Sequence, residues 1–96
     1  MFIILLSYKK NIEEVEKFLV AHRDYLAPYY KSGHFLMSGR KEPRNGGVIL
    51  AKASGRAEID AIIQKDPFWI EDVASYEVIE FIPTTTAPEL SAFRVS

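Results

Sequence analysis

The 96-residue chain contains no cysteine, which excludes disulfides, thiolate metal ligands and cysteine nucleophiles and fits a reducing compartment. Histidine is scarce, because His22 and His34 are the only two, and they lack the HxH or HxxxH spacing of a dedicated metal site. Gly46-Gly47 lacks the strand-glycine-helix context of a phosphate-binding loop. We therefore expect neither a metal nor a cofactor.

An excess of charge of one sign is also missing. The chain has 12 Lys and Arg residues and 13 Asp and Glu residues, which gives a formal net charge of -1 and a pI of about 6.1. A chain of this charge has no electrostatic footprint for nucleic acid or for an anionic membrane. The apolar run from Phe2 to Leu6 is too short to span a membrane and lacks the flanks of a signal peptide. We therefore expect a cytoplasmic protein that binds neither nucleic acid nor membrane.

The remaining composition is that of an ordinary globular protein, with 48% apolar and 26% charged residues, and the length suits one domain. Strand and helix signals alternate along the chain. Runs of aliphatic residues bounded by turn residues predict four strands. These cover residues 2–8, 34–39, 47–53 and 75–82, and a polar loop at 40–47 joins the second strand to the third.

Two helices are expected between these strands. The first begins after Asn11, which can cap it, and stops at Gly33, with a kink or a restart at Pro28 because proline lacks a backbone donor. The second is capped by Ser54 and ended by Pro67. Its apolar stripe consists of Ile59, Ile62 and Ile63.

The order β-α-β-β-α-β is the ferredoxin-like pattern, an α+β fold in which a four-stranded antiparallel sheet carries both helices on one face. We expect residues 1–83 to form this single domain and residues 84–96 to form a C-terminal tail. The strands are apolar on both faces, so the face without helices would be apolar too. We therefore expect a homodimer in which two sheets cover each other, with higher assembly left open.

Asp66 stands before Pro67, and the proline holds it out of the α conformation. Asp-Pro matches the preferences of a helix cap and a first turn, so we expect Asp66 to cap a short turn that runs to about Val73. On a helical wheel, His22 falls on the apolar stripe of the first helix. The other members of that stripe are Val15, Phe18, Leu19, Leu26 and Tyr29. His22 is therefore the most suitable partner for Asp66.

Two interpretations of this pair stay open. A His/Asp pair lets the imidazole exchange a proton near neutral pH while the carboxylate fixes its tautomer, which would make His22 and Asp66 catalytic. Alternatively, Asp66 is only a helix cap, and His22 is a core or interface histidine satisfied by one hydrogen bond.

Four further residues are candidates for substrate binding. Ser38 and Gly39 close the second strand, where small residues could admit a ligand close to the backbone. Arg40 could attract an anionic substrate, and Phe68 could stack on a ring. Each also has a structural interpretation, namely a plain turn, a solvated basic loop and a core or interface aromatic.

Several short motifs, in this order and spacing, resemble those of the YCII-related (YciI-like) family. They are His22-Arg23 with Tyr25-Leu26, Ser38-Gly39, Gly46-Gly47-Val48-Ile49, and Asp66-Pro67-Phe68 followed by a final Val-Ile-Glu-Phe strand. The resemblance covers about Phe2 to Pro83. It implies a dimeric α/β-barrel, built from ferredoxin-like protomers packed sheet to sheet, with an active site at His22 and Asp66. The family often has Gly-Pro where this chain has Gly39-Arg40, and the basic residue suggests a more anionic ligand.

Two hypotheses from different classes follow. In the first, the protein is a small cofactorless enzyme of the lyase or isomerase type, because a dehydrochlorinase of chlorinated hydroxyquinols is one of the chemistries assigned in the family that it resembles. His22, oriented by Asp66, would then move a proton on a small aromatic or enolisable substrate. In the second, the same cavity binds a small molecule without turnover, and both residues are structural. A third, a haem or flavin-free monooxygenase role known for other dimeric barrels of this shape, rests on fold analogy alone.

Overall fold

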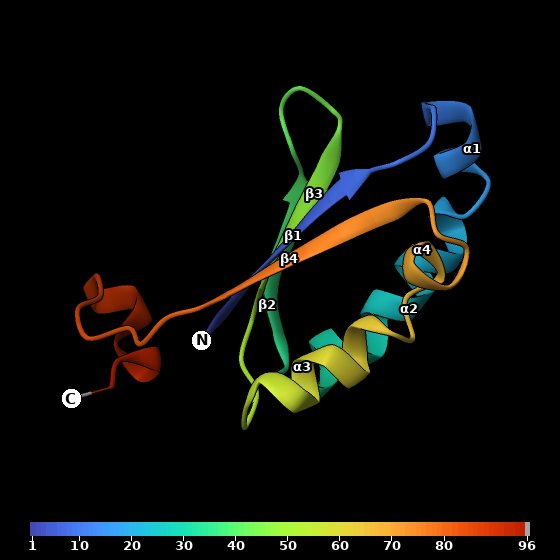
Figure 1. Cartoon of the computed structure of the whole chain (residues 1–96). Coiled ribbons are helices and arrows are strands. Elements are labelled where there is room, and N and C mark those ends of the chain that lie inside the picture. The colour runs from blue at the N-terminus through green and yellow to red at the C-terminus, as the bar shows by residue number, and fades with distance from the viewer. Residues whose placement is uncertain (96) are drawn as a thin grey trace.

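The four strands form one antiparallel sheet in the order β2-β3-β1-β4, in a computed structural model that describes residues 1–95 (Figure 1). Strand β1 is central and pairs with β3 on one side and with β4 on the other. This arrangement confirms the predicted ferredoxin-like fold, and the strand ends differ from the predicted ones by one or two residues. The strands are β1 (Phe2–Tyr8), β2 (Phe35–Arg40), β3 (Gly46–Ala51) and β4 (Ala74–Glu80).

The helices of the domain cover one face of this sheet (Figure 1). They are α1 (Ile12–Glu16), α2 (Leu19–Ser32), α3 (Arg56–Ile63) and α4 (Pro67–Ile70). None of the helices within residues 1–95 combines the length and the apolar character that a membrane crossing needs.

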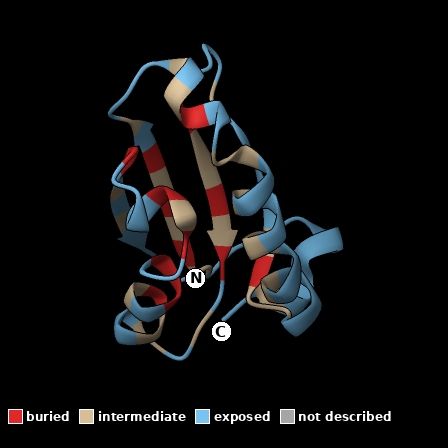
Figure 2. Cartoon of the chain, turned by 90° about the vertical axis from the view of Figure 1, so that its right-hand side faces the viewer, coloured by how far each residue is buried: buried red, intermediate tan, exposed pale blue. Residues whose placement is uncertain are grey.

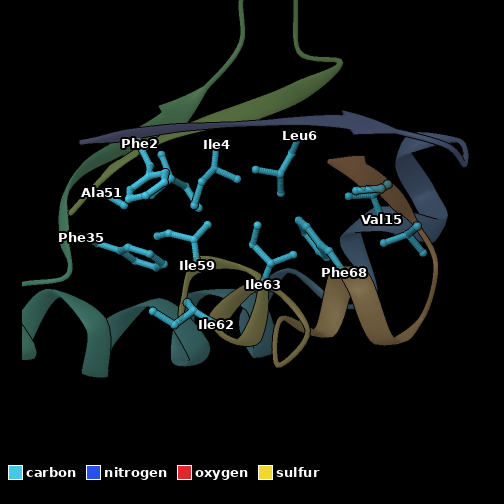
Figure 3. Packing of buried hydrophobic residues seen from close by; sticks show 13 residues of the cluster. Phe2, Ile4, Leu6, Val15, Phe35, Ala51, Ile59, Ile62, Ile63 and Phe68 are labelled. Atoms are coloured by element: carbon cyan, nitrogen blue, oxygen red, sulfur yellow. The ribbon is translucent and has the colours of Figure 1, made fainter. Parts of the chain in front are cut away.

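The hydrophobic core lies between the sheet and the helices (Figure 3). Side chains alternate along a strand, so every second residue of β1 points toward the helices, and the first three of these residues are buried. They are Phe2, Ile4 and Leu6, and they meet the three isoleucines of the predicted stripe on α3, Ile59, Ile62 and Ile63. Figure 2 shows the buried residues on the strands and on parts of the helix layer, where they belong to α1, α3 and α4.

The predicted restart of the helix at Pro28 is wrong, because the helix is not interrupted there. The helical segment is broken earlier, at Lys17 and Phe18, and α2 then continues through Pro28 to a left-handed Gly33 with φ 87°. The proline removes the hydrogen bond that the carbonyl of Asp24 would accept. Asp24 and Pro28 are both exposed, so water can replace that bond and the helix tolerates the proline.

The predicted cap of the second long helix is wrong by one residue. Gly55, and not Ser54, occupies the N-cap position of α3, and no side chain caps it. Ser54 contributes through its backbone, since its N–H donates a hydrogen bond of 3.0 Å to Oε1 of Glu58. This bond, more than any other contact, holds the pKa of the Glu58 carboxyl below its usual value.

The second face of the sheet carries no helix and is apolar. Five apolar residues on it, Ile3, Leu5, Met37, Val48 and Leu50, come from the three neighbouring strands β1, β2 and β3, and we call this surface the open face. Within the described chain Met37 is 56% exposed, so the open face is accessible to solvent or to another protein.

Residues 84–95, which we call the C-terminal arm, lie on the side of the open face, opposite the helices (Figure 1). The arm contains the 3-10 helix Pro88–Phe93 and is held by a hydrogen bond of 2.8 Å from the N–H of Val95 to the carbonyl of Pro83. The radius of gyration is 13.9 Å. A compact chain of this length would have a value of about 12.5 Å, and an arm that projects from the domain accounts for the difference.

Gly46 marks a close approach of β3 to β1. A Cβ atom added to it would lie 1.9 Å from the carbonyl oxygen of Leu6. We predict that Gly46→Ala lowers the free energy of unfolding by about 1 to 3 kcal/mol or prevents folding, because the two strands must separate. Urea denaturation measures the effect. The matched control is Gly39→Ala, whose added Cβ meets nothing within 4 Å. Equal stability of the two variants would contradict the close approach.

Candidate active site

Asp66 is the buried carboxylate of the domain, with a relative exposure of 1%. It is the N-cap of α4, in an extended conformation with φ -69° and ψ 127°, as expected for a residue that precedes proline. Its Oδ1 accepts a hydrogen bond of 2.9 Å from the backbone N–H of Phe68. The helix cap that the Asp-Pro pair predicts is therefore present, and it places the carboxylate between α4 and the sheet.

The same oxygen faces His22 of α2. Nδ1 of the imidazole lies 2.8 Å from Oδ1 of Asp66, within hydrogen-bond distance. The His22 ring also stacks on the ring of Phe68, with centroids 4.1 Å apart and planes 2° from parallel. One tripeptide therefore fixes the imidazole twice, through the carboxylate of Asp66 and through the aromatic face of Phe68.

The second oxygen of the carboxylate is bound from the sheet. The hydroxyl of Tyr76 on β4 donates a hydrogen bond of 2.7 Å to Oδ2 of Asp66. Tyr25 of α2 lies beside this cluster and donates to the carbonyl of Ile62 at 2.8 Å. Burial, and after it the negative charge of Asp66, raises the pKa of both phenols far above the usual range. Both phenols are therefore protonated donors at neutral pH.

His22 also lines a cavity of about 290 Å³ between α2 and the sheet. The side chain of His22 is 13% exposed, whereas that of Asp66 is 1% exposed. A ligand in the cavity could therefore touch the imidazole, while Asp66 lies behind it. Leu6, Tyr8, Leu19, Leu26, Val48 and Ile49 form the apolar part of the lining, and Gly46 and Gly47 add backbone.

The residues that the sequence suggested for substrate binding meet at this cavity. Ser38, Gly39 and Arg40 line it from β2, and Phe68 lines it from α4, beside His22. The hydroxyl of Ser38 is hydrogen-bonded to that of Tyr30 from α2. Three segments that are distant in the sequence are thus brought together around one small volume.

Sequence reasoning missed two residues of the site. Tyr76 lies on a strand that alternates, opposite Leu6 of β1, so its side chain points toward the helices. That alternation was the available signal, but it does not reveal which helix residue the hydroxyl meets. Arg23 falls outside the apolar stripe of the first helix, yet it lines the cavity beside His22. It adds a second guanidinium to that of Arg40.

The second histidine lies elsewhere. Nε2 of His34 is 3.6 Å from Oε1 of Glu58, and its Nδ1 is 2.6 Å from the hydroxyl of Ser32. His34 lines a separate, open depression and does not reach the cavity of His22. Within residues 1–95, no three or more His, Asp or Glu side chains are grouped in a way that could hold a metal ion.

These motifs and this fold now have a family. A model of the YCII-related domain matches residues 1–82, which include both His22 and Asp66. The chain belongs to the YCII-related domain family. The C-terminal arm, residues 84–95, lies outside the matched residues.

A solved structure of similar fold is 5-chloro-2-hydroxyhydroquinone dehydrochlorinase (TftG) from Burkholderia phenoliruptrix, in complex with 2,5-dihydroxybenzoquinone. The TM-score is 0.72, and the alignment covers 86% of this chain and 95% of the dehydrochlorinase chain. The two sequences are 15% identical, so the likeness concerns the fold. No curated protein matches this YCII-related domain in sequence.

Because several groups share the carboxylate of Asp66, its replacement should lower the stability of the protein. Asp66→Asn keeps one oxygen acceptor but replaces the other with an NH₂ group, which cannot accept from Tyr76 or His22. We expect the free energy of unfolding to fall by about 1 to 3 kcal/mol, because a buried donor loses its partner. Urea denaturation measures this effect, and the control is Asp24→Asn on the exposed surface of α2. A variant at position 66 as stable as the control would contradict the role of Asp66 as a shared acceptor.

Proposed function

We propose that this YCII-related domain is a small enzyme without a cofactor, in which His22, oriented by Asp66, exchanges a proton with a small substrate in an elimination or isomerisation. The observation that carries the proposal is the 2.8 Å contact between Nδ1 of His22 and Oδ1 of Asp66 beside an accessible cavity. A histidine held by a carboxylate at one nitrogen is a common arrangement for general acid and base catalysis.

The contact with Asp66 gives the two ring nitrogens of His22 different roles. Because Asp66 accepts at Nδ1, the neutral imidazole carries its proton there, and Nε2 is the nitrogen left for a ligand in the cavity. Nε2 takes a proton from the substrate, and the resulting imidazolium is stabilised by the buried carboxylate of Asp66. The same proton is later returned to the product or to water, so the histidine is regenerated.

The cavity restricts the substrate to a small molecule. Its volume of about 290 Å³ lies at the lower end of the range for small-molecule sites, which suits a single ring with a few substituents. The lining is mainly apolar, and Arg23 and Arg40 add positive charge. Loss of a proton leaves an enolate or a phenolate, and the two guanidinium groups favour that negative charge.

The dehydrochlorinase of similar fold supports a hydroxylated six-membered ring as the substrate, since it is named for a chlorinated hydroxyhydroquinone and its structure holds a dihydroxybenzoquinone. In an elimination of this type, the ring first tautomerises, so that a hydroxyl proton moves to the carbon that bears chlorine and a ketone forms. The base then removes the proton of a second hydroxyl group, electrons move through the ring, and chloride leaves as an anion. No external oxidant or reductant is needed for that step. The His/Asp pair and the guanidinium groups of Arg23 and Arg40 therefore support an elimination of this kind.

The second candidate is a binding protein without turnover. In it, Asp66 is a helix cap and His22 is only a structural hydrogen-bond partner of Asp66. The cap itself favours this alternative, because Asp66 would accept from Phe68 in either case. The two candidates differ in one respect, since only the enzyme requires the imidazole for a chemical step.

Replacement of the histidine separates the candidates. The assay uses a panel of hydroxylated and halogenated rings, and 5-chloro-2-hydroxyhydroquinone is the first of them. We expect the wild type to release chloride. In His22→Ala the rate should fall by about 100-fold or more, which is the usual contribution of a general base. Chloride release is followed by ion chromatography. The matched control, His34→Ala, removes the other histidine and should retain full activity.

Two results would reverse this conclusion. Equal chloride release by wild type and His22→Ala would remove the histidine from the chemistry. Binding of the rings to the wild type, seen as shifts in its NMR spectrum, without turnover of any of them would favour the binding protein.

We further propose that the chain forms a homodimer through the open face and the C-terminal arm. A contiguous apolar surface of this kind is unfavourable in an isolated protomer, and a second copy presents the same surface in return. A cavity of about 380 Å³ lies between the arm and the sheet, with walls of largely apolar residues. Leu36, Met37 and Leu50 line it from the sheet, Phe81 lines it from the residue that follows β4, and Leu90 and Phe93 line it from the arm. Side chains of a partner could fill it.

A charge on the open face tests the dimer. Met37→Asp should convert the protein to monomers in sedimentation velocity, because it would bury an unpaired carboxylate between the two sheets. The matched control is Val20→Asp, at a residue of α2 that is 68% exposed on the helix layer. That variant should sediment like the wild type. A wild-type protein that sediments as a monomer would refute the proposed dimer.

A further inference from the structure

Tyr76 lies outside the cavity and has no part in the proton exchange described above, yet its hydroxyl is bound to the buried carboxylate. It pairs with Leu6 across the sheet, and its side chain therefore points into the helix layer. The ring of Trp69 packs against it, with centroids 5.6 Å apart and planes at 65°. The strand and the aromatic contact together hold the hydroxyl 2.7 Å from Oδ2 of Asp66.

This bond completes the shell of donors around Asp66. Oδ1 accepts from the N–H of Phe68 at 2.9 Å and faces Nδ1 of His22 at 2.8 Å, and Oδ2 accepts from Tyr76. Rotation of the carboxylate about its axis would stretch at least one of these bonds. The Tyr76 hydroxyl therefore fixes the plane of the carboxylate, and with it the direction in which Nδ1 of His22 must point.

In the hydrogen bond between Tyr76 and Asp66, the hydroxyl is always the donor and the carboxylate always the acceptor. Burial and the charge of Asp66 raise the pKa of the Tyr76 phenol far above neutrality, so the hydroxyl keeps its proton and the carboxylate is the acceptor. Each donor to an ionised carboxylate favours the ionised form. A carboxylate that shares its charge with Tyr76 attracts the imidazolium less strongly than a carboxylate without that donor.

We propose that Tyr76 is a positioning residue of the His22–Asp66 pair, which holds Asp66 as a fixed, ionised acceptor and so makes Nε2 of His22 the atom that exchanges protons with the substrate. This inference rests on the proposed function. It assigns to Asp66 the tasks of orienting the imidazole and stabilising the imidazolium, without contact with the substrate, since the carboxylate is 1% exposed.

The test is the ring titration of His22, followed by NMR of protein labelled with ¹⁵N-histidine. In Tyr76→Phe, the carboxylate keeps more negative charge for the imidazolium, and the pair holds its proton more tightly. We expect the midpoint of the His22 titration to rise by about half a pH unit or more. The acid limb of the pH profile of kcat/KM should move in the same direction.

The matched control is Tyr25→Phe, which removes a phenol of the same cluster that donates to the carbonyl of Ile62 and not to Asp66. The other groups near His22, namely Arg23, Arg40 and Tyr8, are unchanged in both variants. The titration midpoint of Tyr25→Phe should move less than that of Tyr76→Phe. Equal midpoints in Tyr76→Phe and the wild type would overturn the inference.

A second measurement covers the case in which Tyr76→Phe does not fold. The Tyr76 hydroxyl proton of the wild type should give a slowly exchanging resonance with a cross-peak to neighbours of Asp66, and a rapidly exchanging hydroxyl would overturn the inference. Neither the ring titration of His22 nor the hydroxyl resonance of Tyr76 requires turnover. Failure of the positioning role is therefore distinct from failure of the enzymatic proposal, which depends on His22→Ala.

Discussion

The structure of the site depends on one requirement, that a carboxylate excluded from water must find its hydrogen-bond donors within the protein. Asp66 meets it with three groups, the ring of His22, the backbone of Phe68 and the hydroxyl of Tyr76. These belong to α2, α4 and β4, which approach Asp66 from different sides. The helix layer and the sheet are therefore joined at one polar point within an otherwise apolar interior, and the same point orients the imidazole beside the cavity.

Local sequence signals were sufficient for most of the fold. Aliphatic runs gave the strands, the isoleucines of α3 gave its buried stripe, and Gly33 ended α2 where its left-handed conformation was expected. The failures lie where a local preference was weak or was overridden. Pro28 stands at an exposed position where water can take the place of the lost bond, and Ser54 donates its backbone N–H to Glu58 while no side chain caps α3.

Some residues of the site could also be predicted from local sequence signals, and others could not. Asp66 was predictable because Asp-Pro at the end of a helix specifies a cap, and His22 because helical periodicity places it on the inner stripe. The hydroxyl of Tyr76 and the guanidinium of Arg23 were not, since their positions depend on how a strand and a helix pack in three dimensions. Alternation shows which side of the sheet Tyr76 faces, but not that its hydroxyl lies 2.7 Å from Oδ2 of Asp66. The contact that completes the carboxylate shell is thus a tertiary property.

A carboxylate at position 66 is expected both from the helix cap and from the proposed proton exchange. An imidazole at position 22 is expected only from the proposed proton exchange. A helix cap needs the N–H of Phe68, and Tyr76 already supplies a donor for the second oxygen. An apolar side chain at position 22 would bury as well against Phe68 without a polar edge at the wall of a cavity. Instead, the site has a histidine that is 13% exposed, stacked on Phe68, and beside a cavity that two arginines also line. The proposed contact of His22 with a ligand would account for this polar edge, and the cap and the stacking on Phe68 account for the fixed position of the ring.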